Sequence, residues 1–134
     1  MRARVVSILP VFAGVLLLGC ELLTRPELEE EFRLAPGQAA AIASTDLVVT
    51  FRKVMEDSRC PSTVVCVWAG NGEVELLART SAGGTTPLIL GTPSGPFEAV
   101  VGEYRIQVLG LDPYPEGPPI QPDAYRLRLR VSAE

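Results

Sequence analysis

Apolar and polar residues alternate with a period of two along most of the chain after residue 32. The clearest case is residues 125–131, Tyr-Arg-Leu-Arg-Leu-Arg-Val, in which every odd position is apolar and every even position is Arg. Such alternation predicts a strand with one buried face and one face in water. Strong strands are predicted over 47–51, 73–78, 104–108 and 125–131, and weaker ones over 32–34, 38–42, 88–90 and 97–101.

Glycine and proline separate these predicted strands. Turn residues stand at 36–37, 70–72, 83–84, 91–96 and 102–103, and they supply either a preset or a permissive backbone φ. No stretch of a dozen residues after Pro36 combines a helical stripe with freedom from Gly and Pro. The pattern predicts an all-β fold, either a small antiparallel β-sandwich of the immunoglobulin-like kind or a small barrel, with one disulfide loop.

Residues 112–122 interrupt this rhythm with five prolines in eleven residues. Only one strand is predicted after them, so we expect a loop between the last two strands and not a linker to a second domain. Because proline limits the entropy that a loop loses on ordering, this loop is expected to be stiff enough to present Tyr114 or Ile120 outward.

The amino terminus has the pattern of an export signal. Arg2 and Arg4 precede an apolar run over 5–18, and a small residue and a cysteine, Gly19-Cys20, follow it. The run is shorter than the roughly 20 residues that cross a bilayer. Leu17-Leu18-Gly19-Cys20 resembles the lipobox of bacterial lipoproteins, although an uncleaved apolar start with an accidental Cys20 is the alternative.

The lipobox resemblance implies cleavage before Cys20 and attachment of acyl chains to that residue. Glu21 follows the cysteine, which in the sorting scheme of diderm bacteria indicates the outer membrane, facing the periplasm. We therefore expect a signal peptide over 1–19, an acylated tether over 20–31 and one β-sandwich domain over 32–134. The expected partners are the membrane, through the lipid anchor, and an envelope protein, and the domain is expected to be a monomer.

The two remaining cysteines, Cys60 and Cys66, are expected to form a disulfide, because two cysteines close together in an exported chain indicate a disulfide bond. Closing a ring of this size stabilises a fold by roughly 2.4 kcal/mol on the chain-entropy estimate. A metal or redox pair is the competing interpretation. The two cysteines do not have the C-x2-C spacing of such sites, and the chain contains no His to complete a zinc shell.

Charge and composition exclude several functions. The chain carries 12 basic and 16 acidic residues, a net charge of −4, and loss of Arg2 and Arg4 leaves ten against sixteen, or −6. Nucleic acid is therefore an unsuitable partner, since phosphate binding needs clustered Lys and Arg and Lys53 is the single lysine. Without His, the Ser-His-Asp and Cys-His catalytic arrangements cannot form, and we expect no enzyme, cofactor or metal.

Carboxylates are what remains for catalysis, and Glu73 and Glu75 share one strand face. A solvated face is the simpler interpretation, with these residues paired to a neighbouring strand that carries Arg126, Arg128 and Arg130. That arginine row has a second interpretation as a site for an anionic ligand or for lipid headgroups.

Residues 57–72, Asp-Ser-Arg-Cys-Pro-Ser-Thr-Val-Val-Cys-Val-Trp-Ala-Gly-Asn-Gly, are the most distinctive stretch. They resemble a group of small bacterial lipoproteins and secreted proteins that share a D-[ST]-R-C-P…C-x-W-x-G motif. That resemblance implies an all-β domain with a disulfide loop and supplies no activity. The candidate binding loop comprises Asp57, Arg59, Trp68 and Tyr114, and Trp68 is expected to pack beside the disulfide, with an exposed ligand platform as the alternative.

These observations favour a bacterial envelope lipoprotein that acts as a non-catalytic protein-binding or structural module. A protease inhibitor that presents the disulfide loop and the Pro-rich loop as a wedge is the alternative. An enzyme or a carrier of small ligands is a third hypothesis, and it requires a sizeable concave pocket.

Overall fold

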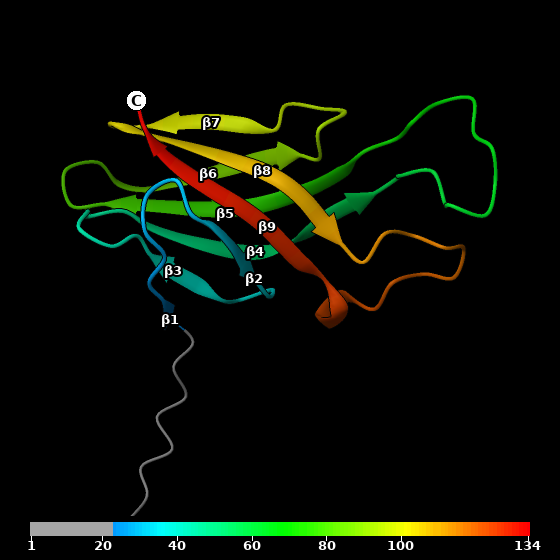
Figure 1. Cartoon of the computed structure of the whole chain (residues 1–134), viewed down its shortest axis with the longest axis horizontal. Coiled ribbons are helices and arrows are strands. Elements are labelled where there is room, and N and C mark those ends of the chain that lie inside the picture. The colour runs from blue at the N-terminus through cyan, green and yellow to red at the C-terminus, as the bar shows by residue number, and fades with distance from the viewer. Residues whose placement is uncertain (1–22) are drawn as a thin grey trace, which may run out of the picture.

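A computed structural model describes residues 23–134, which form two packed β-sheets (Figure 1). The larger sheet has the strand order β1-β3-β4-β5-β6 and the smaller one has the order β2-β9-β8-β7. The all-β sandwich is therefore confirmed, and the barrel is not, because the two sheets do not join. The elements are β1 (Leu23–Thr24), β2 (Glu31–Leu34), β3 (Ala39–Ala41), β4 (Val48–Asp57), β5 (Gly72–Thr80), β6 (Gly84–Gly91), β7 (Glu98–Val101), β8 (Tyr104–Asp112), the 3-10 helix η1 (Pro122–Ala124) and β9 (Arg126–Ala133).

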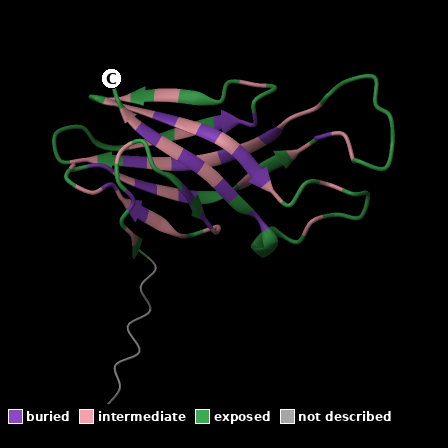
Figure 2. Cartoon of the chain, viewed as in Figure 1, coloured by how far each residue is buried: buried purple, intermediate pink, exposed green. Residues whose placement is uncertain are grey.

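The core lies between the sheets and is built by the alternation seen in the sequence (Figure 2). In β9, Leu127, Leu129 and Val131 are fully buried, because alternate side chains of a strand point to the same face. Phe51 and Leu76 meet them from the larger sheet as fully buried members of the same cluster. All eight predicted strands are present, and β4, β6 and β8 run further than predicted.

The described part of the predicted tether belongs to the domain. Leu23 and Thr24 form β1, which pairs in parallel with Ala39 and Ala40 of β3. The backbone N–H of Glu29 donates to the Val131 carbonyl at 2.8 Å, and Leu28 packs against the core. The expected start of the domain at residue 32 was therefore wrong, since residues 23–31 already pair their backbone and bury an apolar side chain. The signal peptide and Cys20 lie outside the described residues.

The expected pairing of Glu73 and Glu75 with the arginine row was also wrong. These glutamates lie on β5 and the arginines on β9, and the two strands belong to different sheets. Glu75 instead lies opposite Lys53 of β4 and is 4.0 Å from the guanidinium of Arg52. Sequence periodicity identifies strand faces correctly but does not identify which strands are neighbours.

Within residues 23–134, no helix is long and apolar enough to span a membrane.

Candidate functional site

Three loops gather at one end of the sandwich: 58–71 after β4, 92–97 after β6 and 113–125 after β8 (Figure 1). The antiparallel strands of both sheets bring these connections to the same end. The loops contain the predicted disulfide, the Pro-rich segment and three residues of the candidate binding loop, Arg59, Trp68 and Tyr114. The fourth residue, Asp57, ends β4 next to them. This end of the molecule is therefore the candidate site.

A buried ion pair between Arg59 and Asp57 lies at the base of these loops. The Nε and Nη2 atoms of Arg59 each donate to one carboxylate oxygen of Asp57 at 2.7 Å. Their side chains are only 6% and 12% exposed. A buried charge pair is costly to desolvate, so it is stable only when its other donors and acceptors are also paired.

The remaining donors of Arg59 reach across to the end of β8. Nη1 donates to the Leu111 carbonyl at 2.5 Å and Nη2 donates to the Pro113 carbonyl at 3.0 Å. The ring of Tyr114 lies against the guanidinium, 5.3 Å from ring centre to Cζ, a cation–π distance. A single side chain thus joins the disulfide loop in the larger sheet to the Pro-rich loop in the smaller one.

Tyr125, the residue before β9, completes the polar cluster by donating its hydroxyl to Asp57 at 2.9 Å. Burial alone would raise the pKa of Asp57, but the hydrogen bonds from Arg59 and Tyr125 outweigh it and hold the pKa below its ordinary value of 3.8. Burial, together with the bond to Asp57, raises the pKa of the Tyr125 hydroxyl. Asp57 is therefore a permanent anion at neutral pH.

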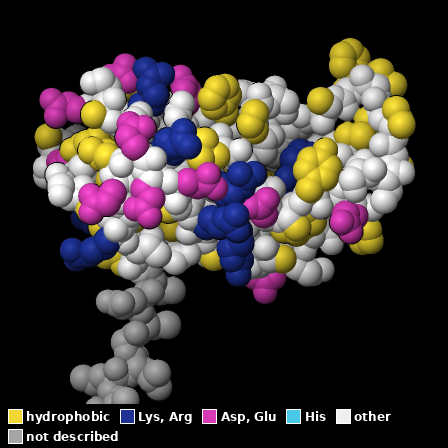
Figure 3. All heavy atoms as spheres, in the orientation of Figure 1, with side chains coloured by type: hydrophobic (Ala, Val, Ile, Leu, Met, Phe, Trp, Pro, Cys, Tyr) yellow, Lys and Arg dark blue, Asp and Glu magenta, His cyan; other side chains and the backbone are white. Residues whose placement is uncertain are grey.

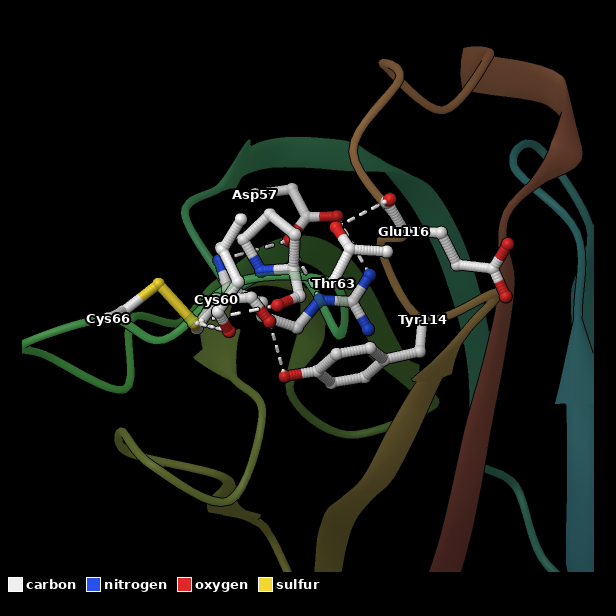
Figure 4. The surroundings of a disulfide bond; sticks show 9 residues. Asp57, Cys60, Thr63, Cys66, Tyr114 and Glu116 are labelled. Atoms are coloured by element: carbon white, nitrogen blue, oxygen red, sulfur yellow. Dashed lines mark hydrogen bonds and ion pairs between the residues drawn. A yellow bond between two sulfur atoms is a disulfide. The ribbon is translucent and has the colours of Figure 1, made fainter.

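Residues 60–69, which we call the disulfide finger, are held at several points (Figure 4). Cys60 and Cys66 form the predicted disulfide, with a Cα–Cα distance of 5.9 Å. The Ser62 amide donates to the Pro115 carbonyl, and the Thr63 hydroxyl donates to the Glu116 carbonyl, both at 3.0 Å. Tyr114 donates its hydroxyl to the Cys60 carbonyl at 2.7 Å. The finger and the Pro-rich loop therefore form one hydrogen-bonded unit.

Four apolar side chains of the finger project into solvent: Val64, Val65, Val67 and Trp68. Trp68 is 82% exposed and Val65 is fully exposed. The finger extends beyond the ends of β4 and β5 (Figure 1), and hydrophobic side chains gather on the protruding lobe of the molecule (Figure 3). The expectation that Trp68 packs beside the disulfide was wrong, because the buried side chain of Arg59 occupies the space next to the core at this end. Trp68 instead forms, with the three exposed valines, an uncharged apolar surface at the tip of the finger.

The candidate binding loop thus divides into two parts. Asp57 and Arg59 are internal and hold the loops together, whereas Trp68 is exposed and Tyr114 is half-exposed with its hydroxyl bonded. Sequence reasoning missed the contribution of Val64, Val65 and Val67. One signal for them was present in the sequence: no charged residue stands between Cys60 and Gly72. A surface loop that combines four large apolar side chains with no charge is unusual.

A groove of about 320 Å³ lies at the root of the finger. Ala69 and Gly70 form one wall, the 92–94 turn forms another, and β8 forms the floor. Gly70 has a φ of +67°, and a Cβ there would lie 1.8 Å from the Ser58 carbonyl oxygen, so only glycine allows this close return of the chain. The groove is at the lower end of the volume range of small-ligand pockets.

Comparisons with protein-family models, curated proteins and solved structures found no match. Within residues 23–134, no group of three or more Cys, Asp or Glu side chains is arranged to hold a metal ion.

The Asp57 pKa predicts how stability depends on pH. A carboxyl group whose folded-state pKa is lowered stabilises the fold above its unfolded pKa of about 3.8 and loses that contribution as the pH falls through the folded value. Asp57→Asn breaks a buried pair and should lower the free energy of unfolding at pH 7 by roughly 3 to 5 kcal/mol. Urea unfolding of wild type and Asp57→Asn should show that the difference between their free energies of unfolding becomes smaller below about pH 3.8.

Asp123→Asn is the matched control, because Asp123 is an exposed carboxylate in the 113–125 loop, at the same end of the sandwich, and its loss should change unfolding little. A difference between wild type and Asp57→Asn that stays constant down to about pH 2.5 would contradict the proposed role of the charged carboxylate.

Proposed function

We propose that this chain is a bacterial envelope lipoprotein whose domain binds another protein through the disulfide finger and catalyses no reaction. The observation that carries the proposal is the exposure of four apolar side chains on a loop that the disulfide and the Pro-rich loop hold in place. Exposed apolar groups of this kind mark interaction sites more often than free surface.

The finger has the features of a binding hot spot. Trp is among the residues that contribute most to protein interfaces, and flanking aliphatic groups exclude water around it. The bonds from Ser62 and Thr63 to the Pro-rich loop hold the finger in one conformation before a partner arrives. A preorganised loop loses less conformational entropy on binding, so more of the apolar contact energy appears as affinity.

Lipid attachment at Cys20 is supported by the lipobox resemblance and by the close disulfide, which suits an oxidising compartment. Only Glu21 and Leu22 separate Cys20 from β1, so an acylated Cys20 would hold the domain within about 10 Å of its anchor. The attachment is therefore a short one, in place of the dozen-residue tether expected from the sequence.

The first described strand, β1, and the finger lie apart on the domain. β1 is level with Ala39 and Ala40, which pair with Thr50 and Val49 of β4. β4 then continues to Asp57 before the finger begins, a further seven residues or about 20 Å of strand. The proposed outer-membrane location facing the periplasm would thus leave the finger free to meet a partner in the envelope.

Site-specific photo-crosslinking in intact cells tests the finger directly. A benzoylphenylalanine at Val65 of the full chain should give a discrete adduct with an envelope protein. Val100 of β7 is the matched position, since it is also apolar and exposed but lies on the other sheet, and it should give none.

Trp68→Ser, introduced beside the Val65 crosslinker, should remove the adduct while it leaves the melting temperature nearly unchanged, because the indole is exposed. Equal adducts from Val65 and Val100, or an adduct that survives Trp68→Ser, would contradict binding through the finger.

The attachment is tested by Cys20→Ser. Wild-type protein should carry the mass of its acyl chains, lack residues 1–19 and sediment with membranes, because two or more chains give lasting anchorage. The variant should keep its signal peptide and lack that added mass. Unmodified Cys20 and retained Met1 in wild type would contradict the lipoprotein proposal.

Protease inhibition is the second candidate, favoured by the hydrogen bonds that join the finger and the Pro-rich loop into one protruding unit. Rigid convex loops of this kind are what inhibitors place into protease clefts. Micromolar full chain in nonionic detergent should then lower the activity of at least one enzyme in a panel of serine and cysteine proteases. Undiminished activity across the panel would eliminate this candidate.

A further inference from the structure

The groove at the root of the finger contains one cationic side chain with unused donors. Arg128 of β9 lines it together with Tyr114, Pro93 and Leu111. The Nε of Arg128 donates to Asp112 at 3.0 Å, and its Nη1 is 3.9 Å from Glu31. Across residues 23–134, the terminal nitrogens of Arg128 make no hydrogen bond to a protein acceptor.

Gly110 sets the position of this guanidinium. It lies opposite Arg128 in the β8–β9 register, and a Cβ at Gly110 would be 2.2 Å from Nη2 and 2.8 Å from Cζ of Arg128. The guanidinium therefore lies across the strand at a place where any other residue would displace it. Because Gly110 has no side chain, the terminal nitrogens of Arg128 have room to lie on the floor of the groove.

The face of the smaller sheet around Arg128 carries several arginines interspersed with carboxylates (Figure 3). Arg33 of β2 lies directly opposite Arg128, and like charges that face each other across strands are unfavourable. Arg126 and Arg130 flank Arg128 on the same face of β9. Among residues 23–134, Asp112 and Glu31 are the two carboxylates that lie within 4.0 Å of the Arg128 guanidinium. Glu31 lies opposite Arg130 and Asp112 lies opposite Arg126, whereas the two residues opposite Arg128 are Arg33 and Gly110. The positive charge of this face is therefore concentrated at Arg33 and Arg128.

Apart from Arg59 and Asp112, the other side chains that line the groove are apolar or neutral. Tyr114 presents a ring that is fixed by its hydroxyl bond to Cys60 and by Arg59, and Pro93 and Ala69 face the same space. Arg59 also lines the groove, but its charge is already paired with Asp57. The groove thus offers the terminal nitrogens of Arg128, which make no hydrogen bond within residues 23–134, beside apolar side chains.

We infer that this groove binds a ligand with a carboxylate at one end and a small apolar body, with Arg128 holding the carboxylate. The planar guanidinium can donate two parallel hydrogen bonds to such a group. Asp112 already neutralises part of the Arg128 charge, which suits a monoanion better than a phosphate dianion. A peptide C-terminus and a short fatty acid share this chemistry. The site is separate from the finger tip, so the two proposals stand or fall independently.

The test is a calorimetric titration of the full chain in nonionic detergent, with amide NMR to locate binding. The peptide probe is acetyl-Ala-Val with a free C-terminus, compared with the same peptide as its amide. The fatty-acid probe is hexanoate, compared with hexanamide. An acid of either kind should bind and shift the Gly70 and Gly110 amides, whereas its amide should not, and the acid that binds identifies the source.

Arg128→Gln should weaken binding of the acid roughly tenfold or more, since hydrogen bonds to a charged group are lost. Arg126→Gln removes the same charge two residues away on the same face, outside the groove, and should change affinity by no more than about twofold. Gly110→Ala keeps every charge but displaces the guanidinium, so it should also weaken binding.

Thermal unfolding of each variant verifies that it is folded. Binding of neither acid, equal binding of acid and amide, or full affinity in both Arg128→Gln and Gly110→Ala would overturn the inference.

Discussion

The buried pair of Arg59 and Asp57 is the interaction on which the loop end of this sandwich depends. Asp57 ends β4, and Arg59 begins the loop that carries the disulfide. From there the guanidinium reaches the Leu111 and Pro113 carbonyls, while Tyr125 approaches the carboxylate from the start of β9. Desolvating two charges is costly, and these additional hydrogen bonds offset that cost. The same bonds fix three chain segments from two sheets relative to one another.

This cluster explains how a small sandwich can carry an exposed apolar loop. The sheets are held by ordinary burial of alternating residues, and the core ends near Leu111 and Tyr125. Ile120 of the Pro-rich loop still packs against this core, whereas polar contacts and the disulfide hold the finger. The finger can therefore keep Val65 and Trp68 in solvent without collapsing onto the domain. In the proposed function, this rigid root would let the apolar contacts of the tip contribute more of their energy to affinity.

The sequence predicts the strands well because each strand repeats one simple rule over several residues. Leu127, Leu129 and Val131 are buried, as their alternation with arginines indicates. It predicts contacts between distant segments poorly. Arg59 meets residues more than fifty positions away, and no local pattern reveals that this arginine, and not Trp68, occupies the space beside the core. The short strand at Leu23 was missed for a similar reason, since its pairing with Ala39 comes from tertiary structure and not from its own two residues.

Hydrogen exchange of the backbone amides tests the central claim most directly, with Arg59→Lys as the variant. Lysine keeps the positive charge beside Asp57 but lacks the planar fork that also reaches the two carbonyls. The account predicts that amides of the finger and of residues 113–121 exchange at least about tenfold faster in the variant, while the amides of β5 and β9 keep their protection. Unchanged exchange in both loops would contradict the claim that the Arg59 guanidinium holds this end of the molecule together.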